Sequence, residues 1–196
     1  MPEQATTHRG PEPARSPASV PAAGKPAPAV VLVGPMGAGK STVAGELARR
    51  TGLPVRDTDI DVENAAGSSI SDLFITEGEA RFREWERAAV LAALAEHPGV
   101  LALGGGAVLD PEVRAALRGH RVVFLNLSMP VGVRRTGMAT NRPLLTGINP
   151  RATYKALLDA RLPLYREVAV LEVDTDALSA VEVAERIDSH FGLATR

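Results

Sequence analysis

The sequence contains no cysteine, which excludes disulfide bonds, thiol catalysis and a zinc site built from cysteines. It also lacks a run of about 18 apolar residues, so we expect no membrane-spanning segment. The N-terminus has no compact apolar stretch of the kind found in secretory signals. Together these absences lead us to expect a soluble cytoplasmic protein.

An excess of positive charge is missing as well. The chain has 22 basic and 23 acidic residues and a net charge of -1, which argues against nucleic acid or a membrane surface as a partner. Any positive groups that bind an anionic substrate must therefore be local. What the chain of 196 residues does have is 45% hydrophobic residues, enough for the core of one domain.

Two regions of different character meet near residue 28. Residues 1–28 are rich in Pro, Ala, Ser and Thr without an apolar period, so we predict a disordered tail. Over residues 29–196, short apolar runs alternate with helical patterns, which predicts one domain with a parallel α/β sheet. The predicted strands are 29–33, 54–57, 100–103, 122–127 and 169–173, and the predicted helices are about 39–51, 77–96, 111–118, 150–162 and 178–190.

The first predicted strand leads directly into Gly-Pro-Met-Gly-Ala-Gly-Lys-Ser at residues 34–41, and a helical pattern follows. This is the phosphate-binding Walker A pattern in the strand–loop–helix context that it requires. Glycines allow backbone N–H groups to surround phosphate oxygens, and the helix N-terminus adds partial positive charge. We predict that Lys40 reaches the β- and γ-phosphates of a nucleotide and that the Ser41 hydroxyl binds Mg²⁺.

An acidic pair, Asp57 and Asp59, follows the second predicted strand. Ligands of parallel sheets bind at the C-terminal ends of the strands, so both carboxylates can face one cleft. One carboxylate can hold Mg²⁺ through water and the other can accept a hydroxyl proton, whereas the structural alternative is a helix N-cap. Beside the phosphate-binding loop we favour the functional role. The chain lacks the Asn-Lys-x-Asp segment that guanine specificity usually needs.

Two further groups of residues have structural as well as functional explanations. Arg83 and Glu86 lie three residues apart on a predicted helix, where Glu86 can orient the guanidinium, although the spacing alone favours an exposed ion pair. Gly104, Gly105 and Gly106 close the third predicted strand. Either a ligand or backbone approaches closely there, or the chain makes a turn.

Two arginines supply local positive charge later in the chain. Arg142 lies in the Gly-, Pro- and Asn-rich segment 137–149, which we interpret as a mobile loop. It suits a lid that brings an arginine onto a transferring phosphoryl group, or it is a solvated loop residue. Arg166 lies in a segment that ends a helix, where it can cap carbonyl groups or bind a substrate carboxylate.

The ordered set of motifs resembles the shikimate kinases, a family of P-loop enzymes similar to nucleoside monophosphate kinases. The resemblance covers about residues 29–190, nearly the whole predicted domain. The segments that carry it are Gly-Pro-Met-Gly-Ala-Gly-Lys-Ser-Thr at 34–42, Asp-Thr-Asp at 57–59, Phe-Arg-Glu-Trp-Glu at 82–86, Gly-Gly-Gly-Ala-Val at 104–108, Arg-Pro-Leu-Leu at 142–145 and Pro-Leu-Tyr-Arg-Glu at 163–167.

The resemblance implies a three-layer α/β P-loop kinase fold with a five-stranded parallel sheet in the order 2-3-1-4-5, flanking helices and a lid loop. It implies that the chain moves the γ-phosphoryl group of ATP to the 3-hydroxyl of shikimate with Mg²⁺, in aromatic amino-acid biosynthesis. A monomer is the family expectation.

The resemblance also implies roles for individual residues. Asp59 is the implied base, and Lys40 and Arg142 complete the catalytic set. Arg83, oriented by Glu86, and Arg166 are implied to hold the ring carboxylate. The implied ATP contacts are Gly37, Ala38, Gly39, Lys40, Ser41, Thr42, Arg135 and Arg142; the implied substrate contacts are Asp59, Arg83, Gly104, Gly105, Gly106 and Arg166; the implied metal contacts are Ser41 and, through water, Asp57.

The chain departs from the family pattern in two places. Residues 174–179 lack the Asn/Arg-Pro stretch of a loop that often contacts adenine, and Gly137-Met138 stands where two glycines are common. Two other functions stay open. A gluconate-type kinase of the same fold would not need two carboxylate-binding arginines. A regulatory nucleotide-binding module without catalysis should have lost at least one catalytic side chain, yet all are present.

Overall fold

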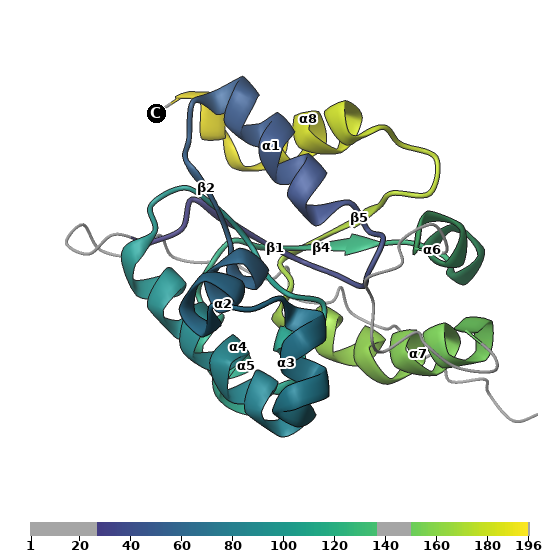
Figure 1. Ribbon diagram of the computed structural model, residues 1–196. Helices are drawn as coiled ribbons and strands as arrows, with labels where there is room; N and C mark the ends of the chain where they lie inside the picture. Colours follow the sequence, from purple (N-terminus) through teal and green to yellow (C-terminus); the bar gives the residue numbers. More distant parts are fainter. Residues whose placement is uncertain (1–26, 137–149, 196) are drawn as a thin grey trace, which may run out of the picture.

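The protein is described here by a computed structural model covering residues 27–136 and 150–195 (Figure 1). Five parallel strands form one sheet in the order β2-β3-β1-β4-β5, as the resemblance implied. The predicted tail lies outside the described residues up to residue 26, and the predicted loop 137–149 lies outside them entirely. The strands are β1 (Val30–Val33), β2 (Val55–Asp57), β3 (Val100–Ala102), β4 (Val122–Asn126) and β5 (Leu171–Asp174).

The central strand β1 is buried on both of its faces. Val30 and Leu32 contribute to one hydrophobic cluster, whereas Val31 and Val33 contribute to the cluster on the opposite face. This alternation follows from the two-residue period of a strand, and it explains why the run is apolar throughout. The loop that leaves β1 therefore starts from a rigid position in the middle of the sheet.

Helices cover both faces of the sheet (Figure 1). On one face, α1 and α8 supply Val43, Leu47, Val183 and Ile187 to the first cluster. On the other face, α4, α5 and α7 complete the second cluster. The α-helices are α1 (Lys40–Thr51), α2 (Thr58–Ala66), α3 (Ile70–Thr76), α4 (Gly78–Glu96), α5 (Pro111–Ala116), α6 (Met129–Thr136), α7 (Pro150–Val168) and α8 (Ala180–Phe191), and the 3₁₀ turns are η1 (Ala107–Leu109) and η3 (Leu193–Thr195).

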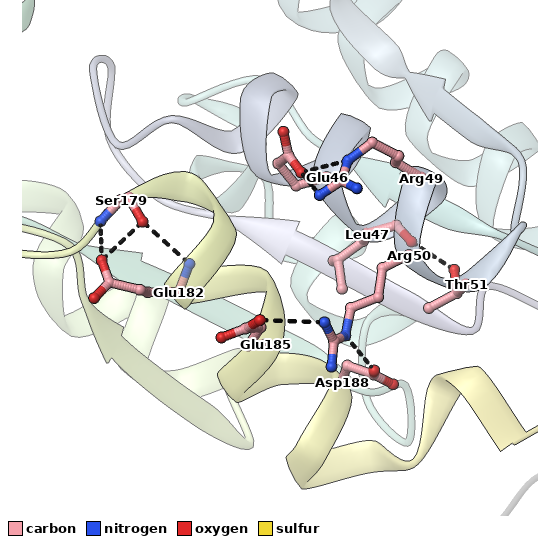
Figure 2. A network of polar contacts seen from close by, with 9 residues as sticks. All are labelled: Glu46, Leu47, Arg49, Arg50, Thr51, Ser179, Glu182, Glu185 and Asp188. Carbon is pink, nitrogen blue, oxygen red and sulfur yellow. Dashed lines mark hydrogen bonds and ion pairs between the residues drawn. The ribbon is translucent and has the colours of Figure 1, made fainter.

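Polar contacts join α1 to α8 at the outer surface (Figure 2). Arg50 of α1 donates hydrogen bonds to Asp188 at 2.7 Å and to Glu185 at 3.3 Å. At the start of α8, Ser179 and Glu182 form a capping box in which each side chain accepts a hydrogen bond from the other residue's backbone N–H. The Arg50 contacts fix α1, the helix that follows the phosphate-binding loop, against α8, whereas the capping box stabilises the first turn of α8 itself.

Two features of the helices differ from the sequence prediction. The helix predicted at 150–162 continues through Pro163 to Val168. Proline removes one backbone donor and usually ends a helix; here the burial of Tyr165 and Val168 in the core offsets that cost. In addition, α2, α3 and α6 were not predicted. They are short, and α2 and α3 pack on α4 through Val62, Leu73 and Phe82 rather than on the sheet.

In the described parts of the chain, none of the helices combines the length and the apolarity that crossing a bilayer requires.

Candidate active site

The loop after β1 has the closed geometry of a phosphate cradle. Gly34 and Gly39 have φ angles of +148° and +86°, in the region that favours glycine. A side chain on Gly34 would also collide with the Leu125 carbonyl oxygen, which lies 2.5 Å from the position of its Cβ. The Lys40 ammonium donates to the Gly34 carbonyl at 2.8 Å and to the Pro35 carbonyl at 3.2 Å, so it curls over the loop. This arrangement can bind the phosphates of a nucleoside triphosphate.

The two aspartates that follow β2 have different environments. Asp57 accepts a hydrogen bond from the Ser41 hydroxyl at 2.7 Å and from the Asp59 backbone N–H at 3.0 Å. The second contact makes Asp57 the N-cap of α2, so the structural alternative from the sequence is present together with the contact to the phosphate-binding loop. The hydroxyl of Ser41 and the carboxylate of Asp57 are adjacent oxygen donors of the type that Mg²⁺ prefers.

Asp59, the second aspartate, lies near Lys40 of the phosphate-binding loop and Glu86 of α4. Burial raises the pKa of Asp59 from 3.8 to about 6; the charge of Lys40 lowers it, and the carboxylates of Asp57, Glu86 and Glu63 raise it. Such a pKa is suited to a group that accepts a proton near neutral pH. A perturbed carboxylate in a cleft is also a typical feature of a functional site.

Arg83 is held between two acidic residues of the same helix. Its guanidinium donates to Glu86 at 2.6 Å and to Glu79 at 2.8 Å. The Glu86 side chain is only 4% exposed, so this pair is not the exposed ion pair that the spacing alone favoured. Burial raises the pKa of the Glu86 carboxyl, while the charges of Arg83 and Arg161 lower it.

Two of the three glycines after β3, Gly104 and Gly106, are explained by the close approach of charged side chains. The chain does turn here, and the Ala107 backbone N–H donates to the Gly104 carbonyl at 3.2 Å, as the turn alternative expected. None of the three glycines has a positive φ angle, however, so the turn itself does not require glycine. A Cβ on Gly104 would lie 2.5 Å from an Asp59 carboxylate oxygen and 2.6 Å from one of Glu86, and a Cβ on Gly106 would lie 2.0 Å from an Arg83 guanidinium nitrogen. The backbone N–H of Gly104 also donates to the buried hydroxyl of Thr58, which ties this loop to the start of α2.

The second arginine at this end of the sheet is Arg161, not the expected Arg166. Arg161 is 5% exposed, lines the cavity and donates to the Gly105 carbonyl at 3.2 Å. Arg166 is exposed and forms two hydrogen bonds with Glu172 of β5, both at 3.0 Å. Because α7 continues past Pro163, residue 161 shares its inner face with Tyr165, whereas residue 166 points away. The expectation for Arg166 is therefore corrected: Arg166 lies outside the cavity, and Arg161 is the arginine of α7 that lines it.

Arg135, near the end of α6, also lines the cavity. It donates to the Thr175 carbonyl at 2.8 Å, to the Thr175 hydroxyl at 3.2 Å and to the Gly37 carbonyl at 3.4 Å. These contacts bring together the phosphate-binding loop and the segment before α8. The implied lid residue Arg142 lies outside the described residues.

One cavity of about 820 Å³ joins these groups. Of the implied site residues, its lining includes Gly37, Ala38, Gly39, Lys40, Ser41, Thr42, Asp57, Asp59, Arg83, Gly105, Gly106 and Arg135, and it also includes Glu86 and Arg161. Gly104 lies directly behind Asp59 and Glu86. A phosphate-binding loop, a carboxylate pair and two partly or wholly buried arginines around one cavity define a P-loop kinase for a small anionic acceptor.

Comparisons with known proteins name the family. The family model described as shikimate kinase matches residues 36–191. The shikimate kinase of Saccharopolyspora erythraea is 56% identical over 160 residues, covering 82% of this chain and 91% of that protein. The shikimate kinase of Salinispora arenicola is 57% identical over 162 residues, covering 81% and 96%. The chain belongs to the shikimate kinase family.

A solved structure has the same fold. The shikimate kinase from Acinetobacter baumannii in complex with shikimate superposes with a TM-score of 0.81 at 35% identity, covering 87% of this chain and 96% of that chain.

Proposed function

We propose that this chain transfers the γ-phosphoryl group of ATP to the 3-hydroxyl of shikimate, giving ADP and shikimate 3-phosphate. The observation that carries the proposal is the single cavity shared by the phosphate-binding loop and the Asp59–Glu86–Arg83–Arg161 cluster. Shikimate has a carboxylate and several hydroxyls on a small ring, and the cluster supplies two cations and an acidic acceptor for those groups.

The side chains around the cavity have different proposed roles in the reaction. Asp59 accepts the proton of the attacking hydroxyl, because a pKa of about 6 leaves it mostly ionised at neutral pH. Arg83 and Arg161 bind the ring carboxylate, since guanidinium groups match carboxylates in charge and geometry. Lys40 and the backbone N–H groups of the loop stabilise charge on the transferred group.

Mg²⁺ fits the oxygen donors of Ser41 and Asp57. Mg²⁺ usually keeps several waters and takes one or two protein oxygens plus substrate phosphates, so two adjacent side-chain oxygens beside the loop are sufficient. The ion would neutralise phosphate charge. Ser41 and Asp57 would hold it, Asp57 through water.

Three further points rest on the sequence and the family expectation. Arg142 is proposed to close over the phosphates, the protein is proposed to act as a cytoplasmic monomer, and residues 1–25 are proposed to be dispensable for activity. Size-exclusion chromatography with light scattering tests the monomer, and a chain starting near Pro26 tests the tail. Full loss of activity in that shortened chain would overturn the third point.

A coupled assay of ADP release with ATP and Mg²⁺ tests the acceptor. We expect turnover with shikimate and none with gluconate or nucleoside monophosphates. Equal turnover with gluconate would support the gluconate-type alternative, and binding of ATP without turnover on any acceptor would support the regulatory module. Family membership and the paired arginines favour shikimate over both.

A further inference from the structure

The chain has only two tyrosines, and both belong to α7. Tyr154 is 2% exposed and Tyr165 is fully buried. Eleven residues correspond to about three helical turns, so both side chains lie on the same face of α7. The mechanism proposed above uses neither of them.

Each tyrosine hydroxyl donates a hydrogen bond to the backbone of a different active-site loop. Tyr154 donates to the Met36 carbonyl of the phosphate-binding loop at 2.9 Å. Tyr165 donates to the Gly105 carbonyl of the glycine loop at 2.5 Å. Burial raises the pKa of Tyr165 well above its usual value, so its hydroxyl remains a donor at any pH used for an assay. One rigid helix thus binds the nucleotide loop and the acceptor loop through the same chemical group.

The two loops are neighbours at the peptides that the tyrosines hold. A Cβ built on Gly105 would lie 3.6 Å from the Met36 backbone nitrogen and 3.6 Å from the Gly34 carbonyl oxygen. Gly105 therefore packs directly on the phosphate-binding loop. The Gly105 carbonyl also accepts a hydrogen bond from Arg161, which lies one turn before Tyr165 and reaches into the cavity.

The path of Tyr154 is accommodated by a glycine on α6. A Cβ on Gly132 would lie 2.0 Å from the Tyr154 hydroxyl oxygen, so only glycine lets this side chain pass α6 and reach Met36. Gly37, next to Met36, packs against the same part of α6, since its Cβ would lie 3.1 Å from the Thr136 methyl group. The contact between Tyr154 and the phosphate-binding loop is thus packed closely against α6.

We propose that α7 sets the separation between the phosphoryl donor and the acceptor, with Tyr154 and Tyr165 as positioning residues that act through Met36 and Gly105. This inference rests on the proposed function. In-line transfer requires reacting atoms at about 3–3.5 Å, and a displacement of about 1 Å can cost on the order of 100-fold in rate. Tyr154 positions the nucleotide side, and Tyr165 positions the acceptor side together with Arg161.

The test is steady-state kinetics of Tyr154→Phe and Tyr165→Phe with ATP and shikimate. Phenylalanine keeps the ring and removes the hydroxyl, and loss of one neutral hydrogen bond corresponds to about 2- to 10-fold in binding. We expect Tyr165→Phe to raise KM for shikimate by that factor with KM for ATP unchanged, and Tyr154→Phe to do the reverse. Both variants should lower kcat by about 10-fold, because the reacting atoms are less well aligned.

Two further variants separate positioning from general stability. Thr51→Val removes a hydroxyl that donates to the Leu47 carbonyl at the far end of α1, a matched hydrogen bond away from the cavity, and should leave both KM values unchanged. Gly132→Ala displaces Tyr154 without altering it, so it should reproduce the rise in KM for ATP. It also keeps the test valid if a tyrosine variant folds poorly.

The outcomes are distinct. A rise in KM for shikimate alone in Tyr165→Phe, together with a rise in KM for ATP alone in Tyr154→Phe, supports the inference. Unchanged kinetics in both tyrosine variants, or equal changes in both KM values that follow a lower melting temperature, would overturn it. A wild-type protein without turnover on shikimate would instead refute the proposed function.

Discussion

The nucleotide side and the acceptor side of the cavity are built in different ways. The nucleotide side consists mainly of consecutive residues, 34–42, whose backbone forms the loop and the first turn of α1. The acceptor side consists of charged side chains from separate elements: Asp59 from α2, Arg83 and Glu86 from α4, and Arg161 from α7. Local chain geometry makes the first site, and tertiary packing makes the second.

This difference predicts unequal sensitivity to substitution. A site made of backbone groups does not lose its donors when one neighbouring side chain changes. A cluster of buried charges depends on each partner, because removing one leaves another charge desolvated and unpaired. We therefore expect single substitutions on the acceptor side to have larger effects than those on the nucleotide side.

The largest effect is expected for Asp59→Asn. The variant keeps the shape of the side chain but cannot accept the hydroxyl proton, and such general-base assistance is typically worth about 10²- to 10⁴-fold. We expect kcat to fall by that factor while ATP binds with unchanged affinity, measured by calorimetry. Asp61→Asn is the control, since Asp61 lies on the same helix but pairs with Arg56 outside the cavity. A kcat close to that of wild type for Asp59→Asn would remove Asp59 from the role of base.

The same variant should be more stable than the wild type at high pH. The pKa of Asp59 is raised to about 6 by the fold, so the folded state binds this proton more tightly than the unfolded state. The wild type therefore loses stability as pH rises from about 4 through 6, a loss that asparagine avoids. Since one pKa unit corresponds to about 1.4 kcal/mol, the gain at pH 8 is at most about 3 kcal/mol.

Urea unfolding at pH 4 and at pH 8 measures this gain in free energy of unfolding. The difference between the variant and the wild type should be large at pH 8 and small at pH 4. Asp159→Asn, a change at an exposed carboxylate of α7, should show no such gain. A lower stability of Asp59→Asn at pH 8 would show that the ionised carboxylate of Asp59 does not destabilise the folded state.

A smaller effect is expected for Arg161→Lys, paired with Arg166→Lys as its control. Lysine keeps the charge but loses the planar geometry that matches a carboxylate, so KM for shikimate should rise by about 10-fold or more. Arg166 contacts Glu172 at the surface, so its replacement should leave KM within about twofold, as is usual for exposed pairs. The reverse pattern would restore the role that the sequence resemblance implied for Arg166.

The error at Arg166 shows where sequence reasoning reached its limit. The sheet order, which the family resemblance implied, was confirmed. The phosphate-binding loop directly follows β1, and Asp57 and Asp59 lie at the end of β2 and the start of α2, because these positions depend on local patterns. Pro163 suggested that the helix ends near residue 162. With a helix end at that point, the sequence could not show that Arg161 and Tyr165 lie on the same helix face. A helix continued to Val168 would have aligned Arg161 with Tyr165 by the spacing of four residues.

Other parts of the site depend on contacts that no local pattern encodes. The space between Gly104 and the carboxylates of Asp59 and Glu86 exists only once three elements have packed together. The same holds for the hydrogen bond between Thr58 and the glycine loop. Short helices such as α3 owe their stability to packing on α4, so their sequences carry weak signals.

The smallest effect is expected on the nucleotide side, for Arg135→Ala. Arg135 contacts the Thr175 and Gly37 backbone carbonyls beside the loop, but the loop keeps its own N–H groups when this side chain is removed. Loss of contacts of this kind is worth about 0.5–1.5 kcal/mol, so KM for ATP should rise by about 2- to 10-fold while KM for shikimate and the melting temperature stay nearly constant. Arg134→Ala, at the neighbouring exposed position, should change neither KM. If Arg135→Ala raised KM for ATP by 100-fold or more, the nucleotide side would depend on a side chain as strongly as the acceptor side does, and the contrast between the two would fail.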